Sequence, residues 1–132
     1  MTDLRYADPE LLVAEWLHGQ LSVKTWADPE LPERWDYTAP LVWIQRGQGS
    51  GDTVLTLDDV LLDVAVLAKI ADNARETAEL VRREIRLNLP LTTFDNGVFC
   101  TGSSTFSAPS WAPATGVFRR EATYRVILHG VV

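Results

Sequence analysis

The chain has 132 residues, 46% of them hydrophobic, which is enough for one packed domain and too few for two, so we expect residues 1–132 to form a single domain. Its 18 acidic and 12 basic residues leave a net charge of −6. Because Lys and Arg neutralise the phosphates of nucleic acids and anionic lipids, this balance argues against a nucleic-acid reader and a membrane-surface protein. Cys100 is the only cysteine, which excludes an internal disulfide and a metal cage built from cysteines.

The first residues, Met1–Tyr6, lack the basic-then-apolar pattern of a signal peptide. No apolar run approaches the roughly 20 residues that span a bilayer. We therefore expect synthesis in the cytosol and no membrane partner.

The N-terminal part of the chain predicts a short helix. Asp8 can accept hydrogen bonds from free N–H groups of the first turn, and Pro9 suits the first helical position. Gly19 is the expected stop. The buried side is an apolar stripe of Leu12, Val13, Trp16 and Leu17.

Residues 20–46 predict two strands with an irregular stretch between them. Alternation over Leu21–Trp26 suggests a short strand, and Pro29 and Pro32 break any regular element after it. The run Leu41–Ile44 is short and apolar and reads as a buried strand.

The segment 47–52 is rich in glycine and predicts a flexible hairpin tip, which Thr53–Leu57 extends. The next stretch, Asp59–Ala68, is apolar on both faces except for Asp63. A strand of this kind is normally covered by protein on both sides. In so small a chain, we expect a neighbouring subunit to supply the second cover.

The C-terminal half predicts one long helix and two strands. Asn73–Asn88 is amphipathic, and Asn73 with Glu76 resembles a capping box. Val98–Phe106 reads as a strand and residues 107–116 as a loop. Val117–His129 alternates between apolar and polar residues, which predicts a long strand with one buried and one polar face. The apolar face consists of Phe118, Ala122, Tyr124, Val126 and Leu128.

The order of these elements predicts an α+β fold. We expect a two-layer sandwich with an antiparallel or mixed sheet of about four to five strands, one long amphipathic helix and a short N-terminal helix.

Candidates for chemistry are few. His18 and His129 lack companion ligands at metal-binding spacing, and Cys100 falls in a strand, where a buried inert thiol is usual. Asp58 and Asp59 are adjacent on a strand and so point to opposite faces. We therefore expect no catalytic residues, no metal and no cofactor.

The glycine run Gly47, Gly49 and Gly51 lacks the spacing, the lysine and the following helix of a phosphate-binding loop. A loop that orders on contact with a partner is the alternative, and we assign these glycines to a subunit or partner interface.

Asp63 must be paired, at a sheet edge or at an interface, because an isolated carboxylate is costly in an apolar strand. We expect a partner in the segment Arg119–Arg125 of the same chain, with an intersubunit pair as the alternative. Three of the five tryptophans, Trp26, Trp35 and Trp111, fall in Pro-rich segments. Because Trp is enriched at protein interfaces, we expect at least one of them to be interfacial.

Taken together, the elements resemble a known family. The run Pro40–Gly47 precedes a Gly-rich turn, the strand Leu61–Ala68 leads into the helix Asn73–Asn88, and a Pro/Trp-containing loop precedes the last strand with Arg120–Val126. Over about residues 8–130 this pattern is similar to the small neck proteins of long-tailed bacteriophages, most of all the tail terminators and their head–tail joining relatives. The Trp- and Pro-rich stretch before Pro40 matches loosely.

The resemblance implies a subunit of a ring, expected to be a homohexamer, at the head-proximal end of the tail in the virion, assembled in the host cytoplasm. The implied partners are further copies of the chain, the tail tube protein and the head-connector protein. DNA would pass through the ring without specific binding, and no catalytic residues are implied. Two alternatives remain: a head-completion or connector protein of the same neck, and a small-molecule-binding or enzymatic α/β domain.

Overall fold

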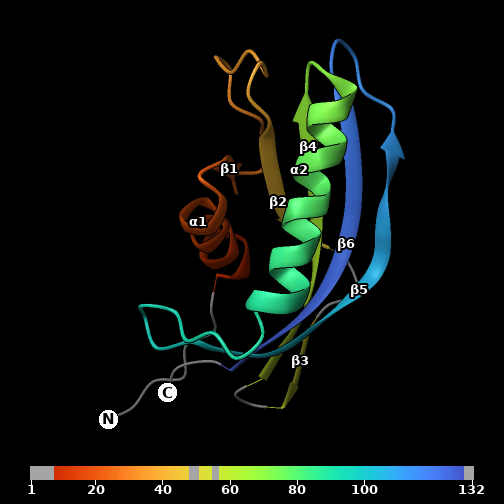
Figure 1. Ribbon diagram of the computed structural model, residues 1–132. Coiled ribbons are helices and arrows are strands. Elements are labelled where there is room, and N and C mark those ends of the chain that lie inside the picture. Colours follow the sequence, from red (N-terminus) through yellow and green to blue (C-terminus); the bar gives the residue numbers. More distant parts are fainter. Residues whose placement is uncertain (1–7, 48–50, 55–56, 130–132) are drawn as a thin grey trace.

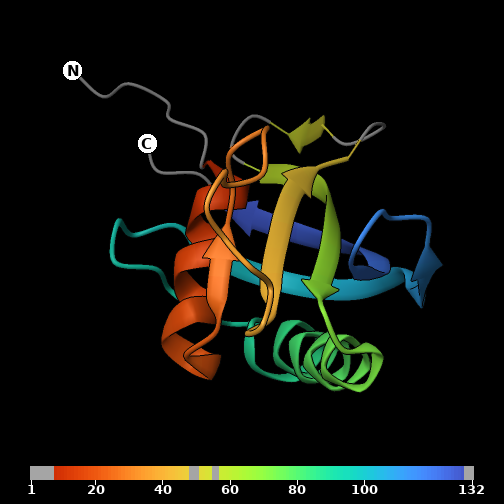
Figure 2. The same cartoon turned by 90° about the horizontal axis from the view of Figure 1, so that it is seen from above.

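The computed structural model describes residues 8–47, 51–54 and 57–129 and shows an α+β fold with two layers, as predicted (Figure 1). Both helices cover one face of a mixed sheet (Figure 2). In chain order the elements are α1 (Pro9–Leu21), β1 (Lys24–Trp26), β2 (Leu41–Arg46), β3 (Gly51–Val54), β4 (Leu57–Ala68), α2 (Ala71–Arg83), a π-helical turn η1 (Glu84–Asn88), β5 (Phe99–Ala112) and β6 (Phe118–His129).

The strand order is β1-β2-β4-β6-β5, and β3 also pairs with β4. Among the described strands, only the β1–β2 pair is parallel. The central pair, β4 with β6, runs without a register shift from Leu57↔His129 to Ala68↔Phe118. This long ladder explains why β4 is the most apolar stretch of the sequence, since a central strand has protein on both of its edges and a layer above it.

The predicted hairpin tip at 47–52 is corrected only at its end, where Gly51 and Asp52 belong to β3. Because β6 occupies one side of β4 along its whole length, β2 and β3 both lie on the other side, and both run antiparallel to β4. They therefore follow each other along the same flank of β4. Residues 48–50, Gly49 among them, lie outside the described part of the chain.

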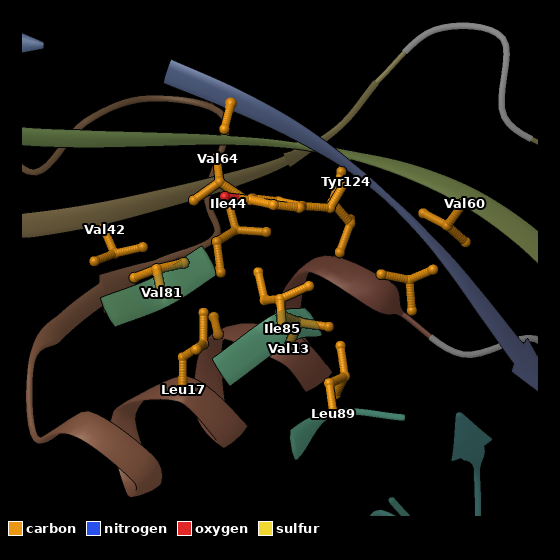
Figure 3. Packing of buried hydrophobic residues seen from close by; sticks show 14 of the residues in the cluster. Val13, Leu17, Val42, Ile44, Val60, Val64, Val81, Ile85, Leu89 and Tyr124 are labelled. Atoms are coloured by element: carbon orange, nitrogen blue, oxygen red, sulfur yellow. The ribbon is translucent and has the colours of Figure 1, made fainter. Parts of the chain in front are cut away.

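The main core lies between the sheet and the helices. Figure 3 shows Ile85 between side chains of the sheet, such as Ile44 and Tyr124, and those of α1, such as Val13. All four side chains are essentially inaccessible to solvent. The alternation predicted for β6 is confirmed from Ala122 to Leu128, whereas Phe118 at its start is 48% exposed.

The helix ends follow local chemistry with two corrections. The Asp8 carboxylate accepts a hydrogen bond from the Leu11 backbone N–H, as the sequence predicted. However, α1 continues past Gly19 to Leu21 and ends at Ser22, which adopts a left-handed conformation (φ 55°). The capping box at Asn73 is wrong because α2 begins at Ala71, and the residue that precedes it makes no side-chain cap.

The predicted loop at 107–116 is wrong in its first half. β5 continues to Ala112 and pairs with β6 through Ser110↔Glu121 and Trp111↔Arg120. Three register shifts, the last between Ser107 and Ser110, accommodate the irregular sequence. Pro109 is tolerated because β5 is an edge strand, where a missing N–H need not break a ladder.

Candidate interaction surface

The second face of the sheet carries a smaller core that the chain itself supplies. Leu41, Ala65 and Leu67 are buried there. Leu31, Trp35 and Tyr37, from the segment that joins β1 to β2, pack against them. We call Trp26, Trp35 and Trp43 the tryptophan cover; all three are half-buried against this core. At this end of the sheet, the expected cover from a neighbouring subunit is therefore replaced by residues of the same chain.

Hydrogen bonds hold the tryptophan cover in place. Each indole N–H donates to a backbone carbonyl of the irregular segment: Trp26 to Glu30 (2.6 Å), Trp35 to Ala39 (3.1 Å) and Trp43 to Asp28 (2.9 Å). The Gln45 side-chain amide adds a bond to Asp28 and one to Ala27, each 3.0 Å. The segment is thus ordered without a helix or strand, because side chains take up carbonyls that secondary structure would otherwise bind.

The carboxylates of this segment point to solvent. We call Asp28, Glu30, Glu33 and Asp36 the acidic segment; all four are exposed. The backbone N–H and hydroxyl of Thr38 donate to Asp36 at 3.0 and 2.8 Å, and these bonds lower the pKa of that carboxyl. Between the carboxylates lies a hollow whose apolar lining is Pro29, Leu31 and Pro32, next to Trp26.

Asp63 lies on the same face, beyond the tryptophan cover, and is exposed. Its carboxylate accepts a hydrogen bond from the Thr123 hydroxyl at 2.8 Å. The partner comes from the expected segment of β6, although it is a threonine and not an arginine. Gly47 packs against Asp63, since a methyl group at Gly47 would lie 3.1 Å from Oδ2. Arg125 instead binds Asp59 through two hydrogen bonds.

At the free end of the β5–β6 hairpin, two aromatic rings are exposed beside two arginines. Trp111 (43% exposed) and Phe118 (48%) meet edge to face, with ring centroids 6.1 Å apart. The guanidinium carbon of Arg120 lies 4.8 Å from the Trp111 ring, and that of Arg75 on α2 lies 5.4 Å from it. We call these four residues the aromatic corner. Cation–π attraction stabilises this arrangement without removing the rings from solvent.

The described residues that the sequence singled out thus lie in four places. Trp26 and Trp35 share the tryptophan cover, Gly47 and Asp63 contact each other, and Trp111 lies at the other edge of the sheet. Gly51 begins β3. Sequence reasoning missed Phe118, Arg75 and Arg120. The alternation of β6 had assigned Phe118 to the core, and nothing local in the sequence links Arg75 on a helix to the hairpin.

The groups considered for chemistry do not converge. Cys100 is buried, and this burial raises the pKa of its thiol to about 11, so the thiol is protonated at neutral pH. Asp58 and Asp59 separate as predicted: Asp58 is buried and forms an ion pair with Arg46 at 2.7 Å, while Asp59 pairs with Arg125. Among the residues that the structure describes, no three or more His, Cys, Asp or Glu side chains form a group able to hold a metal ion.

None of the described helices has the length and apolar character needed to cross a membrane. No known protein-family profile matches the sequence, and no curated protein matches it either.

Proposed function

We propose that this protein is a structural subunit of a phage neck, and specifically a tail terminator that forms a ring on the tail tube and joins it to the head connector. The observation that carries the proposal is the aromatic corner. Trp and Arg are among the residues most enriched at the energetic centres of protein interfaces, and here they meet where the end of the β5–β6 hairpin lies beside α2.

The outer edge of β5 is protected against pairing with a strand of another molecule, which favours assembly through side-chain contacts. Cys100 exchanges backbone hydrogen bonds of 2.8 Å with Leu91 and Thr92, and Arg86 donates to the Ser103 carbonyl at 2.5 Å. Pro109 then lacks an N–H farther along. Such features are how natural sheets avoid uncontrolled edge-to-edge association. A subunit that must form a closed ring of fixed size benefits from the same protection.

The charge of the chain also fits the proposal. A net charge of −6 gives the subunit an overall repulsion toward DNA, so a ring of such subunits would let DNA pass without binding it. In this proposal the protein is assembled in the host cytoplasm and resides in the virion, at the head-proximal end of the tail.

The test is to add the purified protein to tail tube protein during polymerisation and to image the products by electron microscopy. We expect a cap at one end of each tube and a shorter, narrower distribution of tube lengths. Tubes of unchanged length without caps would contradict the tail-terminator assignment. Binding to DNA-filled heads in a parallel sample, with no effect on tubes, would instead favour a head-completion protein.

A further inference from the structure

Two exposed patches of opposite charge lie at the same end of the molecule, on opposite edges of the sheet. The acidic segment precedes β2, next to the edge strand β1, and the aromatic corner lies on the hairpin that ends the other edge strand, β5. Figure 1 shows the two segments at the upper left and upper right, and Figure 2 shows them apart when the molecule is seen from above. Building on the proposed ring, we infer that the aromatic corner of one copy docks on the acidic segment of the next copy.

The chemistry of the two patches is complementary. The aromatic corner presents two rings flanked by the guanidinium groups of Arg75 and Arg120. The acidic segment presents a hollow with an apolar lining of Pro29, Leu31 and Pro32. Its border consists of the carboxylates of Asp28, Glu30 and Glu33 and the guanidinium of Arg34. Aromatic rings that fill such a hollow would bring the arginines to its acidic border, where charge-assisted hydrogen bonds are strong.

The local charges also decide between the arrangements of two copies. Between residues 28 and 36 the chain has four carboxylates and one cation, Arg34. Besides the hydrogen bonds from Thr38, the charge of Lys69 lowers the pKa of Asp36, and Lys24 lies over two rings of the tryptophan cover. On the aromatic corner, Arg75 shares its charge with the exposed Asp72 at 3.1 Å, while Arg120 makes no ion pair that the structure records. Contacts between two acidic segments or between two aromatic corners would bring like charges together, which costs free energy. A contact between unlike patches is favourable and heterologous, and such a contact closes into a ring when its rotation allows.

Both patches are ordered before any contact forms. The backbone of the acidic segment is held by the indole N–H groups of the tryptophan cover. The aromatic corner is fixed by the Trp111↔Arg120 pairing of β5 with β6 and by the contacts of Arg75. Preorganised patches lose little conformational entropy on association, which leaves more of the contact energy for binding.

The experiment uses two charge-reversed variants of the full chain. The basic-side variant is Arg75→Glu with Arg120→Glu, and the acidic-side variant is Glu30→Arg with Glu33→Arg. Association of each variant, of the wild type and of an equimolar mixture is measured by sedimentation velocity at low salt, with and without tail tubes. The control is Arg82→Glu with Arg83→Glu, two other arginines on α2, which changes the net charge by the same amount as the basic-side variant. Circular dichroism and urea unfolding verify that every variant is folded.

We expect the wild type and the control to associate, each reversed variant alone to associate at least about tenfold more weakly, and the mixture to recover association. Recovery is the decisive result. In the mixture, the unchanged acidic segment of one variant can meet the unchanged aromatic corner of the other, and the two reversed patches are again opposite in charge. Variants that associate as the wild type does, or a mixture that fails to recover, would overturn this contact and leave the ring proposal standing. A wild type that stays monomeric even with tubes would overturn both.

A fluorescent DNA duplex is titrated into the same samples. We expect no binding above that of the control variant. Binding by the wild type that the basic-side variant loses, while protein association is unchanged, would assign the aromatic corner to nucleic acid and overturn the inference.

Discussion

The two faces of the sheet are covered by different kinds of structure. On one face, α1, α2 and η1 bury a continuous core that reaches from β2 to β5. On the other face, an irregular segment buries a small cluster at one end, and Asp63 and Arg125 remain exposed beyond it. We therefore expect the helix-covered face to contribute most of the stability, whereas the second face and its flanking hairpin leave more surface exposed.

The largest expected effect is a difference in the free energy of unfolding between variants of two neighbouring residues of β4, one on each face of the sheet. Leu62 is fully buried under the helices, and its neighbour Leu61 is half-buried on the second face. We expect Leu62→Ala to lower the free energy of unfolding by about 3 kcal/mol, because it leaves a cavity in a close-packed core. Leu61→Ala should cost less than about 1 kcal/mol. Urea unfolding of the two variants measures the difference, and equal losses would contradict the comparison.

A second pair of variants distinguishes the tryptophan cover from the aromatic corner. Trp43 packs on the smaller core and donates a hydrogen bond to Asp28, while Trp111 is exposed. We expect Trp43→Ala to lower the free energy of unfolding by about 2 kcal/mol, since it removes apolar contact and one hydrogen bond. Trp111→Ala should change it by about 0.5 kcal/mol or less, and should instead weaken association. A large loss of stability in Trp111→Ala would show that the corner serves folding.

Alkaline pH should weaken the helix-covered face. Burial raises the pKa of Cys100 from 9.0 to about 11 and that of Tyr124 from 10.0 to about 12. Below pH 9 both groups are protonated in the folded and the unfolded chain, and their contribution to stability is fully present. As pH rises, the unfolded chain loses these protons first, so stability falls between pH 9 and 12, by on the order of 1 kcal/mol or more.

Thermal unfolding at a series of pH values measures this decline. In Tyr124→Phe the decline should be smaller and should end near pH 11, because only the part due to Cys100 remains. A melting temperature that stays constant from pH 9 to pH 12 would contradict the burial of both groups.

The smallest effect is expected at the exposed part of the second face. Asp63 makes its hydrogen bond with Thr123 in contact with solvent. We expect Asp63→Asn to change the free energy of unfolding by about 0.5 kcal/mol or less, because exposed polar pairs contribute little. Urea unfolding of the isolated chain tests this value. A loss above about 2 kcal/mol would show that Asp63 is part of a network that the second face needs in order to fold.

The sequence predicted well what periodicity encodes. The apolar run of β4, the alternation from Ala122 to Leu128 and the Asp8 cap all reflect local rules of strands and helices, and they were confirmed. The α+β class followed from their order. The first turn of α2 was mispredicted because Asn73 offered a plausible cap, while the chain begins the helix directly after the strand without one.

What the sequence could not predict depends on contacts between distant segments. Pro109 and its neighbours have loop composition, yet β6 provides a partner strand that carries β5 on to Ala112. The tryptophan cover forms because carbonyls near Pro29 meet indole N–H groups from two strands. The aromatic corner likewise requires Arg75 of α2 to meet Trp111. Single-sequence periodicity contains no information about such encounters.

The central claim is that the exposed surfaces of this domain join copies of it into a ring. Negative-stain electron microscopy of the purified protein, alone and with tail tubes, tests it most directly, with mass measurement on the same sample. We predict rings with a central hole and a mass that is a multiple of 14.7 kDa. Particles of 14.7 kDa at every concentration, together with bare tube ends, would contradict it.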